Sequence, residues 1–449
     1  MSEWCTKQIK DLGRVVTGKT PPTNNPEYFD GDKLFVSPKD LGWDQFYVKE
    51  TETHISTKAL EKFRNQVIPK NAVMFTSLSF AFGKIGIASE PSLTNQQINS
   101  VIVNEQNCFR FVYYLLRVYR PIIFSYNSGI DTPIVPKSVF ESIKVKTPDK
   151  VLQRKIAAIL SAYDDLIENN KRRIVLLEKM AEEIYREWFV RMRFPRHEKV
   201  KFEKGVPEGW AKVSLSNLGK YLNGYAFKQS DWYAEGTPII KIKEMTSGVS
   251  PDTPRNTGES IDKKYHFSDE DIIFSWSATL LVKIWDQGPG LLNQHLFKVT
   301  PSKNIPKSFL YFSIKFSLEM FESLTTGATM KHIKRKELDF VKVNLPPREI
   351  LDQFDSIVFG MLKNKLNLSK SNRLLIEVRD KLSGRLISGK LSVEGLDIQF
   401  PPSMIELTSF DEHAKPKRAL LDVLKDIKIN APKDFSENLD AYLNGEKYI

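Results

Sequence analysis

Residues 149–192 read DKVLQRKIAAILSAYDDLIENNKRRIVLLEKMAEEIYREWFVRM and contain neither proline nor glycine. Mostly apolar side chains recur in alternating steps of four and three residues, the spacing of a helix seam buried against another helix. The seam positions are Ile156, Leu160, Tyr163, Ile167, Asn170, Ile174, Leu177, Ala181, Ile184 and Trp188. At about 1.5 Å per residue the helix would be roughly 60 Å long, far longer than an ordinary globular helix. The stretch therefore predicts a long helix that needs a partner.

A second copy of this pattern lies 198 positions further along the chain, from Arg348 to about Lys390. Lys365 and Arg379 occupy two of its seam positions, and Gly360 lies inside the helix. The segments before the two stretches also match: Asn95-Gln96 with Asn293-Gln294, Gly129 with Gly327, Ile143-Lys144-Val145 with Val341-Lys342-Val343, and Pro148 with Pro346. Because an internal repeat outweighs other signals of fold, we predict two copies of one unit, a globular domain followed by a long helix.

The predicted fold class is α+β. Short β-rich runs between turn clusters, with an apolar helical segment at Phe109–Tyr119, indicate mixed globular domains. The two long helices are expected to pair as an antiparallel coiled coil in a pseudo-two-fold arrangement. The predicted segments are a first globular domain (1–147), a first helix (148–194), a connector (195–209), a second globular domain (210–345), a second helix (346–390) and a C-terminal tail (391–449) with a short amphipathic helix at Lys417–Ile427.

Asn170 is a polar residue in the first seam, and the repeat predicts what faces it. If the helices run antiparallel about the seam midpoint, residue 172, Asn170 lies opposite Asn372. Two facing amides satisfy each other, whereas a slipped register leaves each buried amide unpaired at a cost of about 1–3 kcal/mol. The alternative is that both side chains reach solvent. We predict that this pair fixes the helix register.

Composition limits the class of partner. Lys and Arg number 66 and Asp and Glu 55, so the formal net charge is +11, and 11% of the 449 residues are aromatic. A basic, aromatic-rich chain favours a polyanionic partner over a merely basic surface. Cys5 and Cys108 are too far apart to indicate a disulfide framework or a metal site, which fits a reduced cytoplasmic setting. The N-terminus is polar and no apolar run approaches ~18 residues, so we expect neither an export signal nor a membrane span.

Three short motifs allow an enzymatic interpretation. Gly13–Thr20 matches a phosphate-binding loop, but Pro21-Pro22 follows where a helix should begin, and we interpret it as a turn of the repeated domain. Asn25–Tyr28 is like an amino-methyltransferase motif without its cofactor loop. Asp252 with Asp262–Lys264 fits a loose nuclease pattern that the first half lacks. His295 is interpreted as a polar loop residue, because Gln97 stands at the equivalent place.

Residues 1 to about 390 resemble the specificity subunit of type I restriction–modification systems. The resemblance rests on the repeat itself, on Leu12-Gly13 with Gly18–Pro22, Leu218-Gly219 with Gly224, the Asn95-Gln96 and Asn293-Gln294 pairs, Glu187–Val190 with Phe194-Pro195, and Val206–Trp210. It implies that each globular unit is a target recognition domain for half of a bipartite DNA site. It also implies that the paired helices act as a ruler and as a dock for methylation subunits, with two such subunits expected. The implied partners are double-stranded DNA, methylation subunits and restriction subunits, without a membrane.

The resemblance implies a non-catalytic chain. No cofactor is expected on it, and S-adenosylmethionine, ATP and Mg²⁺ belong to the partner subunits. Two rival functions remain open: an autonomous methyltransferase or nuclease, and a coiled-coil scaffold that does not touch DNA.

Basic and small polar residues in the repeated loops are the predicted DNA contacts. Lysines would mainly set affinity, while Ser, Thr, Asn and Gln could read base edges. For each residue the alternative is a structural hydrogen bond in a turn or at a strand end. The candidates are Lys19, Thr20, Ser77, Ser79, Lys84, Asn95 and Gln96 in the first head, and Lys228, Ser275, Ser277, Lys283, Asn293 and Gln294 in the second. Leu166, Leu176 and Phe189 are predicted to be exposed and to dock partner subunits.

Overall fold

The computed structural model describes residues 4–401, except 79–80, 129–131, 204, 325–332 and 334–335, and also residue 404. The first unit of the chain, residues 1–401, is compact. It contains both globular domains, here called the first and second head, and both long helices. The predicted tail helix Lys417–Ile427, as well as Ser79, Gly129 and Gly327, lies outside the described residues.

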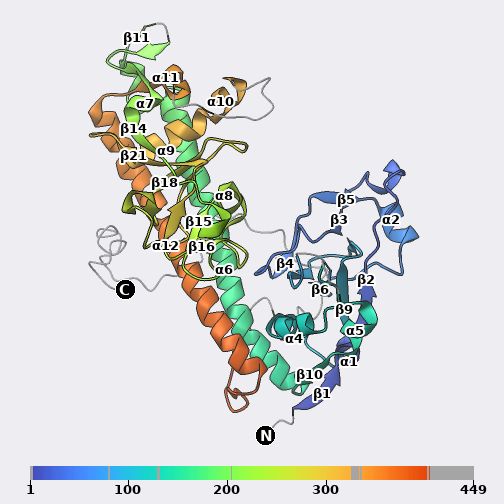
Figure 1. Cartoon of the computed structure of the whole chain (residues 1–449). Coiled ribbons are helices and arrows are strands. Elements are labelled where there is room, and N and C mark those ends of the chain that lie inside the picture. The colour runs from blue at the N-terminus through green and yellow to red at the C-terminus, as the bar shows by residue number, and fades with distance from the viewer. Residues whose placement is uncertain are drawn as a thin grey trace, which may run out of the picture. The chain divides into compact units, whose positions relative to one another are not determined.

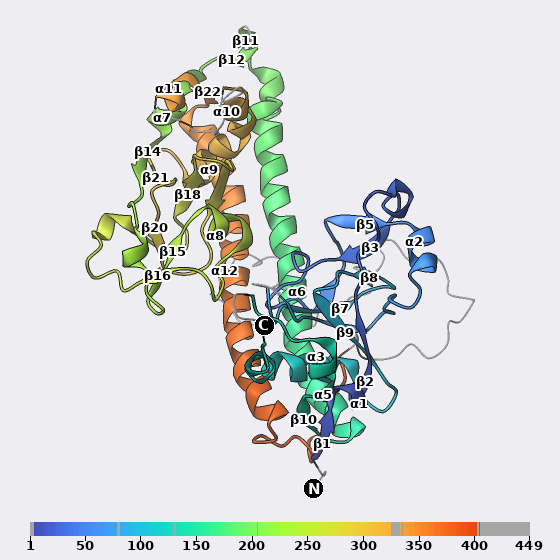
Figure 2. The ribbon, with the colours of Figure 1, turned by 45° about the vertical axis from the view of Figure 1, so that its right-hand side comes forward.

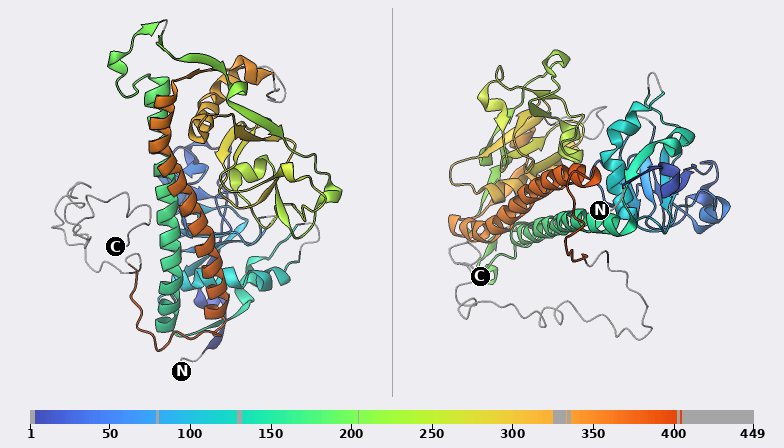
Figure 3. Two further views of the ribbon diagram at one scale, coloured as in Figure 1. Left: turned by 90° about the vertical axis from the view of Figure 1, so that its left-hand side faces the viewer. Right: turned by 90° about the horizontal axis from the view of Figure 1, so that it is seen from below.

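Two long helices run side by side through the first unit (Figures 1 and 3). The first, α6 (Lys150–Tyr185), begins where the Asp149 side chain accepts a hydrogen bond from the Leu152 amide, and continues into a π-helical turn, η2 (Arg186–Val190). The second, α12 (Arg348–Ile387), begins after Pro347. Residues that face each other rise in number along one helix and fall along the other, so the pair is antiparallel, as the repeat predicted.

The first head is built on a five-stranded sheet in the order β2-β9-β6-β7-β4. A separate three-stranded sheet has the order β5-β3-β8. Strand β1, at the start of the domain, pairs with β10, at its end. Its strands are β1 (Cys5–Gln8), β2 (Gly13–Thr17), β3 (Lys33–Val36), β4 (Tyr47–Val48), β5 (Thr53–Ile55), β6 (Val73–Thr76), β7 (Ile85–Ala88), β8 (Leu93–Thr94), β9 (Ile98–Val103) and β10 (Lys144–Thr147). Its helices are α1 (Ile9–Leu12), α2 (Thr57–Lys62), α3 (Phe109–Val118), α4 (Arg120–Ser125) and α5 (Lys137–Ser142).

The second head repeats this plan, because β14-β21-β18-β19 has the topology of β2-β9-β6-β7. A second sheet has the order β16-β15-β20-β17, and β13 pairs with β22. Its strands are β13 (Ala211–Ser214), β14 (Gly219–Asn223), β15 (Thr237–Ile240), β16 (Arg255–Asn256), β17 (His266–Phe267), β18 (Ile272–Ser275), β19 (Leu281–Ile284), β20 (Gly290–Leu292), β21 (Leu296–Pro301) and β22 (Lys342–Leu345). Its helices are α7 (Leu215–Leu218), α8 (Ile242–Ser247), α9 (Lys307–Phe316), α10 (Leu318–Leu324) and α11 (Glu337–Phe340). The connector carries the hairpin of β11 (Phe202–Glu203) and β12 (Val206–Pro207).

One apolar helix from each head attaches it to the long helices. Figure 2 shows α3 between the sheet of the first head and α6, and α3 also touches α12. The repeat-related helix α9 packs against α12 and α6 at the second head. Seven of the ten residues of each of α3 and α9 are buried, because the sheet covers one side of each helix and the long helices cover the other. The heads are thereby fixed to both long helices rather than tethered by loops.

Two expectations about local structure were wrong. Phe189, in the π-helical turn that continues α6, is only 6% exposed because α12 and the second head both pack over it. The centroid of its ring lies 4.8 Å from that of Phe354 on α12 and 5.1 Å from that of Phe309 on α9. Phe189 therefore belongs to the core and cannot dock a partner. Residues Gly13–Thr17 form strand β2 rather than a turn, paired along their length with β9. Among the described residues, no helix is long and apolar enough to span a bilayer.

Candidate nucleic-acid interface

The segment that follows strand β2 and the Asn95-Gln96 segment of the first head lie in contact. Gly18 lies so close to the end of β8 that a Cβ atom there would be 2.1 Å from the Thr94 carbonyl oxygen, which explains the glycine. Beyond it, the Thr20 hydroxyl donates to Gln96 Oε1 at 2.7 Å and accepts from Asn95 Nδ2 at 3.3 Å. Three predicted residues, distant in sequence, thus form one polar cluster beside exposed Lys19, whose ammonium lies 5.6 Å from the Phe63 ring centroid.

Ser77 adjoins this cluster but is buried. Its amide donates to the Gln97 carbonyl at 2.9 Å, and its hydroxyl accepts from Asn99 Nδ2, also at 2.9 Å. A side chain only 5% exposed and held in this way supports the loop instead of facing a ligand. Lys84 is half-buried and donates to the Pro38 carbonyl at 3.3 Å.

The second head brings the equivalent segments together. A Cβ atom on Gly224 would lie 2.2 Å from the Asn293 carbonyl oxygen, and the Tyr225 amide donates to the Leu292 carbonyl at 2.8 Å. Ser277 and Asn293 are buried, and the Ser275 hydroxyl donates to the Thr279 carbonyl at 2.6 Å. These three residues are therefore parts of the loop framework.

Aromatic side chains occupy the second cluster where the first is polar. Trp276 Nε1 donates to Asn223 Oδ1 at 3.1 Å, and the Trp276 ring lies 5.8 Å from the His295 ring. Tyr225 is exposed and Gln294 half-buried beside them. The two heads thus present the same backbone framework with different side chains.

Two lysines of the second head lie away from this cluster. Lys228 is exposed, and its backbone amide donates to Asp231 Oδ2 at 2.7 Å in a separate turn. Lys283 projects from β19 toward the long helices, where burial lowers its pKa. Asp286 and Glu178 raise that pKa in part, and Lys365 lowers it further. Lys283 therefore lies near the long helices rather than in the loops.

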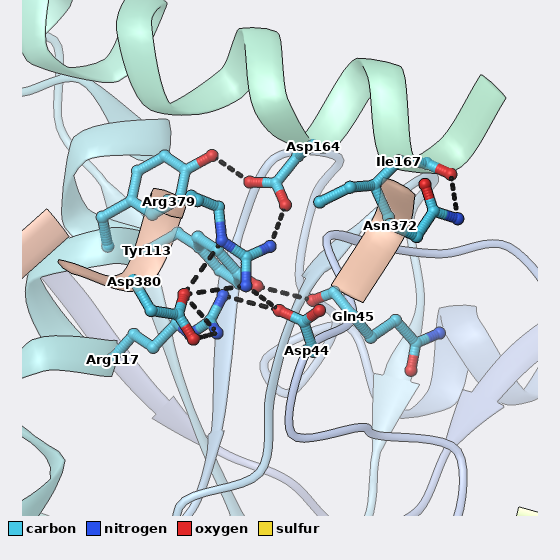
Figure 4. Close-up of polar contacts among 10 residues, drawn as sticks. Asp44, Gln45, Tyr113, Arg117, Asp164, Ile167, Asn372, Arg379 and Asp380 are labelled. Carbon is cyan, nitrogen blue, oxygen red and sulfur yellow. Dashed lines mark hydrogen bonds and ion pairs between the residues drawn. The ribbon is translucent and has the colours of Figure 1, made fainter. Parts of the chain in front are cut away.

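The predicted asparagine pair meets between the long helices. Asn170 Nδ2 donates to Asn372 Oδ1 at 2.9 Å, and Asn372 Nδ2 points to the Ile167 carbonyl oxygen at 3.5 Å, as Figure 4 shows for the latter. Both side chains are buried. The amides therefore satisfy each other inside the seam, in the antiparallel register that the repeat predicted.

Sequence reasoning missed two ion pairs in the same seam. Lys365 Nζ lies 3.0 Å from Glu178 Oε2, and Arg379 pairs with Asp164. Burial alone would raise the pKa of Glu178, but Lys365, the Tyr311 hydroxyl and Lys315 outweigh it and lower that pKa to about 2. The two basic residues that seemed to interrupt the second seam are therefore compensated by carboxylates on the first helix.

The enzymatic motifs have structural roles here. Asn25 Oδ1 accepts from the Glu27 amide at the start of a 3₁₀ turn, Lys243 pairs with Asp252, and Lys264 lies 3.0 Å from Asp262. Across the part of the chain that the structure describes, no group of three or more His, Cys, Asp or Glu side chains is arranged to hold a metal ion.

Two like heads fixed to one antiparallel helix pair define a protein built from two copies of one unit, held at a set distance. The profile of the family described as "Type I restriction modification DNA specificity domain" matches residues 1–179 and 207–374. The match covers well over half of the chain, which therefore belongs to this family.

Similar proteins agree over nearly the whole length. The chain is 29% identical over 411 residues to the type I restriction enzyme MjaIX specificity subunit of Methanocaldococcus jannaschii, covering 88% of this chain and 95% of that protein. It is 28% identical to the HindI specificity subunit of Haemophilus influenzae, covering 87% of this chain and all of that protein. The crystal structure of a type I restriction–modification S subunit from M. genitalium has a TM-score of 0.50 at 15% identity and covers 86% of this chain and 96% of its own, which supports the fold.

Proposed function

We propose that this chain is the DNA-specificity subunit of a type I restriction–modification complex and that each head reads one half of a bipartite DNA site. The observation that carries the proposal is the repeated loop cluster, polar in the first head and largely aromatic in the second, built on the same backbone framework in both heads and held on one helix pair. Two reading heads at a fixed separation suit two half-sites at a fixed spacing on the duplex. The family and its named members support the same assignment.

The two half-sites should differ in sequence. Lys19 and Thr20 of the first head correspond to Tyr225 and Ala226 of the second, and Gln97 corresponds to His295. Ammonium, hydroxyl and amide groups suit phosphates and base edges, whereas tyrosine and histidine offer aromatic faces and different donors. In the first head, Lys19, Thr20, Asn95 and Gln96 are our preferred contacts; in the second, they are Lys228 and Gln294.

Methylation subunits are proposed to dock on the side of the helices that faces away from the heads. Glu178 faces the second head, where it accepts a hydrogen bond from the Tyr311 hydroxyl at 2.7 Å. Leu176, two positions earlier, projects from the opposite side, since helix residues advance by 100°, and is 58% exposed. On α12, Asp380 faces the first head and Val378 is exposed on the other side.

This apolar face occurs twice, as the repeat requires. Leu176 and Met180 on α6 correspond to Leu374 and Val378 on α12 across the 198-residue offset, and all four are exposed. Leu166, 45% exposed, extends the face on α6. Exposed leucines grouped in this way favour burial by a partner, and two equivalent groups favour two copies of it.

The chemistry of such a complex is assigned to partners. We propose that methylation subunits bring S-adenosylmethionine, that restriction subunits use ATP and Mg²⁺, and that this chain binds DNA without a cofactor of its own. The purified chain, incubated with DNA, S-adenosylmethionine and Mg²⁺, should neither methylate nor cut. Turnover by the chain alone would favour the autonomous-enzyme alternative. Absence of any binding of duplex DNA by the chain would favour the scaffold alternative.

Exchange of one head tests the reading mechanism. Residues 210–345 would be replaced by the equivalent domain of a relative with a different methylation motif, and the methylated motif would be mapped in cells. One half of the motif should change while the other half stays the same. A change in both halves would refute independent reading by the two heads.

A further inference from the structure

A buried arginine joins the first head to both long helices (Figure 4). The side chain of Arg379, on α12, is 1% exposed. Its guanidinium pairs with Asp164 of α6, with Asp44 of the first head and with Asp380 of its own helix, the last at 2.9 Å. Three segments of the chain that are remote in sequence therefore converge on one side chain.

Helix α3 of the first head is held in the same cluster. Arg117 Nη1 lies 2.8 Å from Asp44, and its Nη2 binds both oxygens of Asp380 at 3.0 Å. The Tyr114 hydroxyl donates to Asp164, and the Tyr113 hydroxyl donates to the Gln45 carbonyl at 2.9 Å. The head is thus bound through α3 and through the Asp44 loop at once.

In each copy of the repeat, the head forms an ion pair with the long helix of the other copy. Arg117 of the first head binds Asp380 of the second long helix, and its repeat equivalent Lys315 binds Glu182 of the first long helix at 2.8 Å. Beyond this shared pair the two attachments differ, since the equivalent of Arg379 is Ala181. The guanidinium cluster is therefore specific to the first head.

The chemistry of the cluster favours a single geometry. A guanidinium is planar, and its donors bind carboxylates in fixed directions, whereas an ammonium is a point charge on a flexible stem. Burial alone would lower the pKa of Arg379, but Asp164, Asp44 and Asp380 outweigh it and raise that pKa, so the side chain stays charged. Rotation or sliding of the head would separate these groups and leave buried charges unpaired.

We propose that Arg379 is a positioning residue that sets the spacing between the two half-sites by locking the first head onto both long helices. The inference rests on the function proposed above. One added base pair moves a half-site by about 3.4 Å and rotates it by about 35°. A head locked to α12 by the Arg379–Asp44 and Arg117–Asp380 ion pairs tolerates one spacer length. A loosened head also tolerates spacers one or two base pairs shorter or longer.

The test uses the complete complex with its methylation subunits. Plasmids carry the half-sites mapped in cells with the native gene, separated by the native spacer or by spacers one and two base pairs shorter or longer. Wild-type complex should methylate the native spacer. With Arg379→Met, methylation of the off-length spacers relative to the native one should rise at least about tenfold, which corresponds to about 1.4 kcal/mol, while the half-site sequences stay unchanged.

A control and a second variant keep the outcome decisive. Lys381→Met alters a side chain on the same helix that is 73% exposed, and it should leave spacer selectivity at the wild-type level. An equal loss at every spacer for Arg379→Met, with a folded complex, would overturn the inference. If that variant does not fold, Asp380→Asn decides, because it keeps the buried arginine: unchanged selectivity overturns the inference and relaxed selectivity supports it. Failure of the wild-type complex to methylate any spacer would instead refute the proposed function.

Discussion

The asparagine pair between the long helices gives the sharpest stability prediction. Asn170 and Asn372 are buried and joined at 2.9 Å. Replacing either by leucine removes one amide and leaves the other without its partner in the seam. Replacing both removes the need for the hydrogen bond and adds apolar contact.

The structure sets the expected magnitudes. Asn170→Leu leaves the Asn372 oxygen unpaired, although its amide keeps the 3.5 Å contact with the Ile167 carbonyl. Asn372→Leu leaves the Asn170 amide group without the acceptor it uses. An unsatisfied buried polar group costs about 1–3 kcal/mol, so each single variant should lose that much free energy of unfolding, with Asn170→Leu toward the lower end. The double variant should lie within about 1 kcal/mol of wild type or above it.

Urea unfolding of the whole chain, followed by helix circular dichroism, measures these differences as a double-mutant cycle. The expected coupling between the two substitutions is about 1–3 kcal/mol, and the slope of the transition should stay constant across the four proteins. Additive losses, with no recovery in the double variant, would show that the two amides do not depend on each other and would refute the register argument.

Three further outcomes follow from the exposed face, the buried carboxylate and the polar loops. Leu176→Asp and Leu374→Asp should each remove one methylation subunit from the purified complex, and retention of both subunits by the double variant would exclude this docking face. Folding lowers the pKa of Glu178 from 4.5 to about 2, so the stability that its charged form contributes is complete above pH 4.5 and is lost as the pH falls through 2. In Glu178→Gln, the slope of the free energy of unfolding against pH in this acid range should decrease by the equivalent of up to one bound proton. Lys19→Ala should weaken DNA binding about equally for all sequences and lower the salt dependence by about one counterion, whereas Gln96→Ala should change the preferred bases.

The regular features of the fold could be predicted because they repeat. The seam of α6 and its copy in α12 gave two long helices and an antiparallel register, and the structure places Asn170 against Asn372 accordingly. The same alignment puts Arg379 opposite Tyr163 and Lys365 opposite Leu177, so each basic residue lies one position from its carboxylate, Asp164 or Glu178. Both ion pairs could therefore be predicted from the sequence by applying the helix register to the charged seam positions.

Other errors came from contacts that no local pattern encodes. Phe189 was expected to be exposed on the outer face of the helix pair, but Phe309 of the second head and Phe354 of α12 cover it, and both come from distant segments of the chain. Among the predicted DNA contacts, Ser77 and Asn293 turned out to be buried loop supports, since a small polar residue suits a tight loop as well as a base edge. The position of Asp44 next to Arg379 depends on how the first head packs against the long helices, and no local sequence pattern predicts that packing.

Base-resolution mapping of methylated DNA, in cells with and without this gene, tests the central claim most directly. The account predicts a methylated motif of two short specific parts separated by a fixed number of unspecified base pairs, present only when the gene is present. An identical methylation pattern in both cells, or a gene-dependent motif that is continuous instead of bipartite, would contradict it.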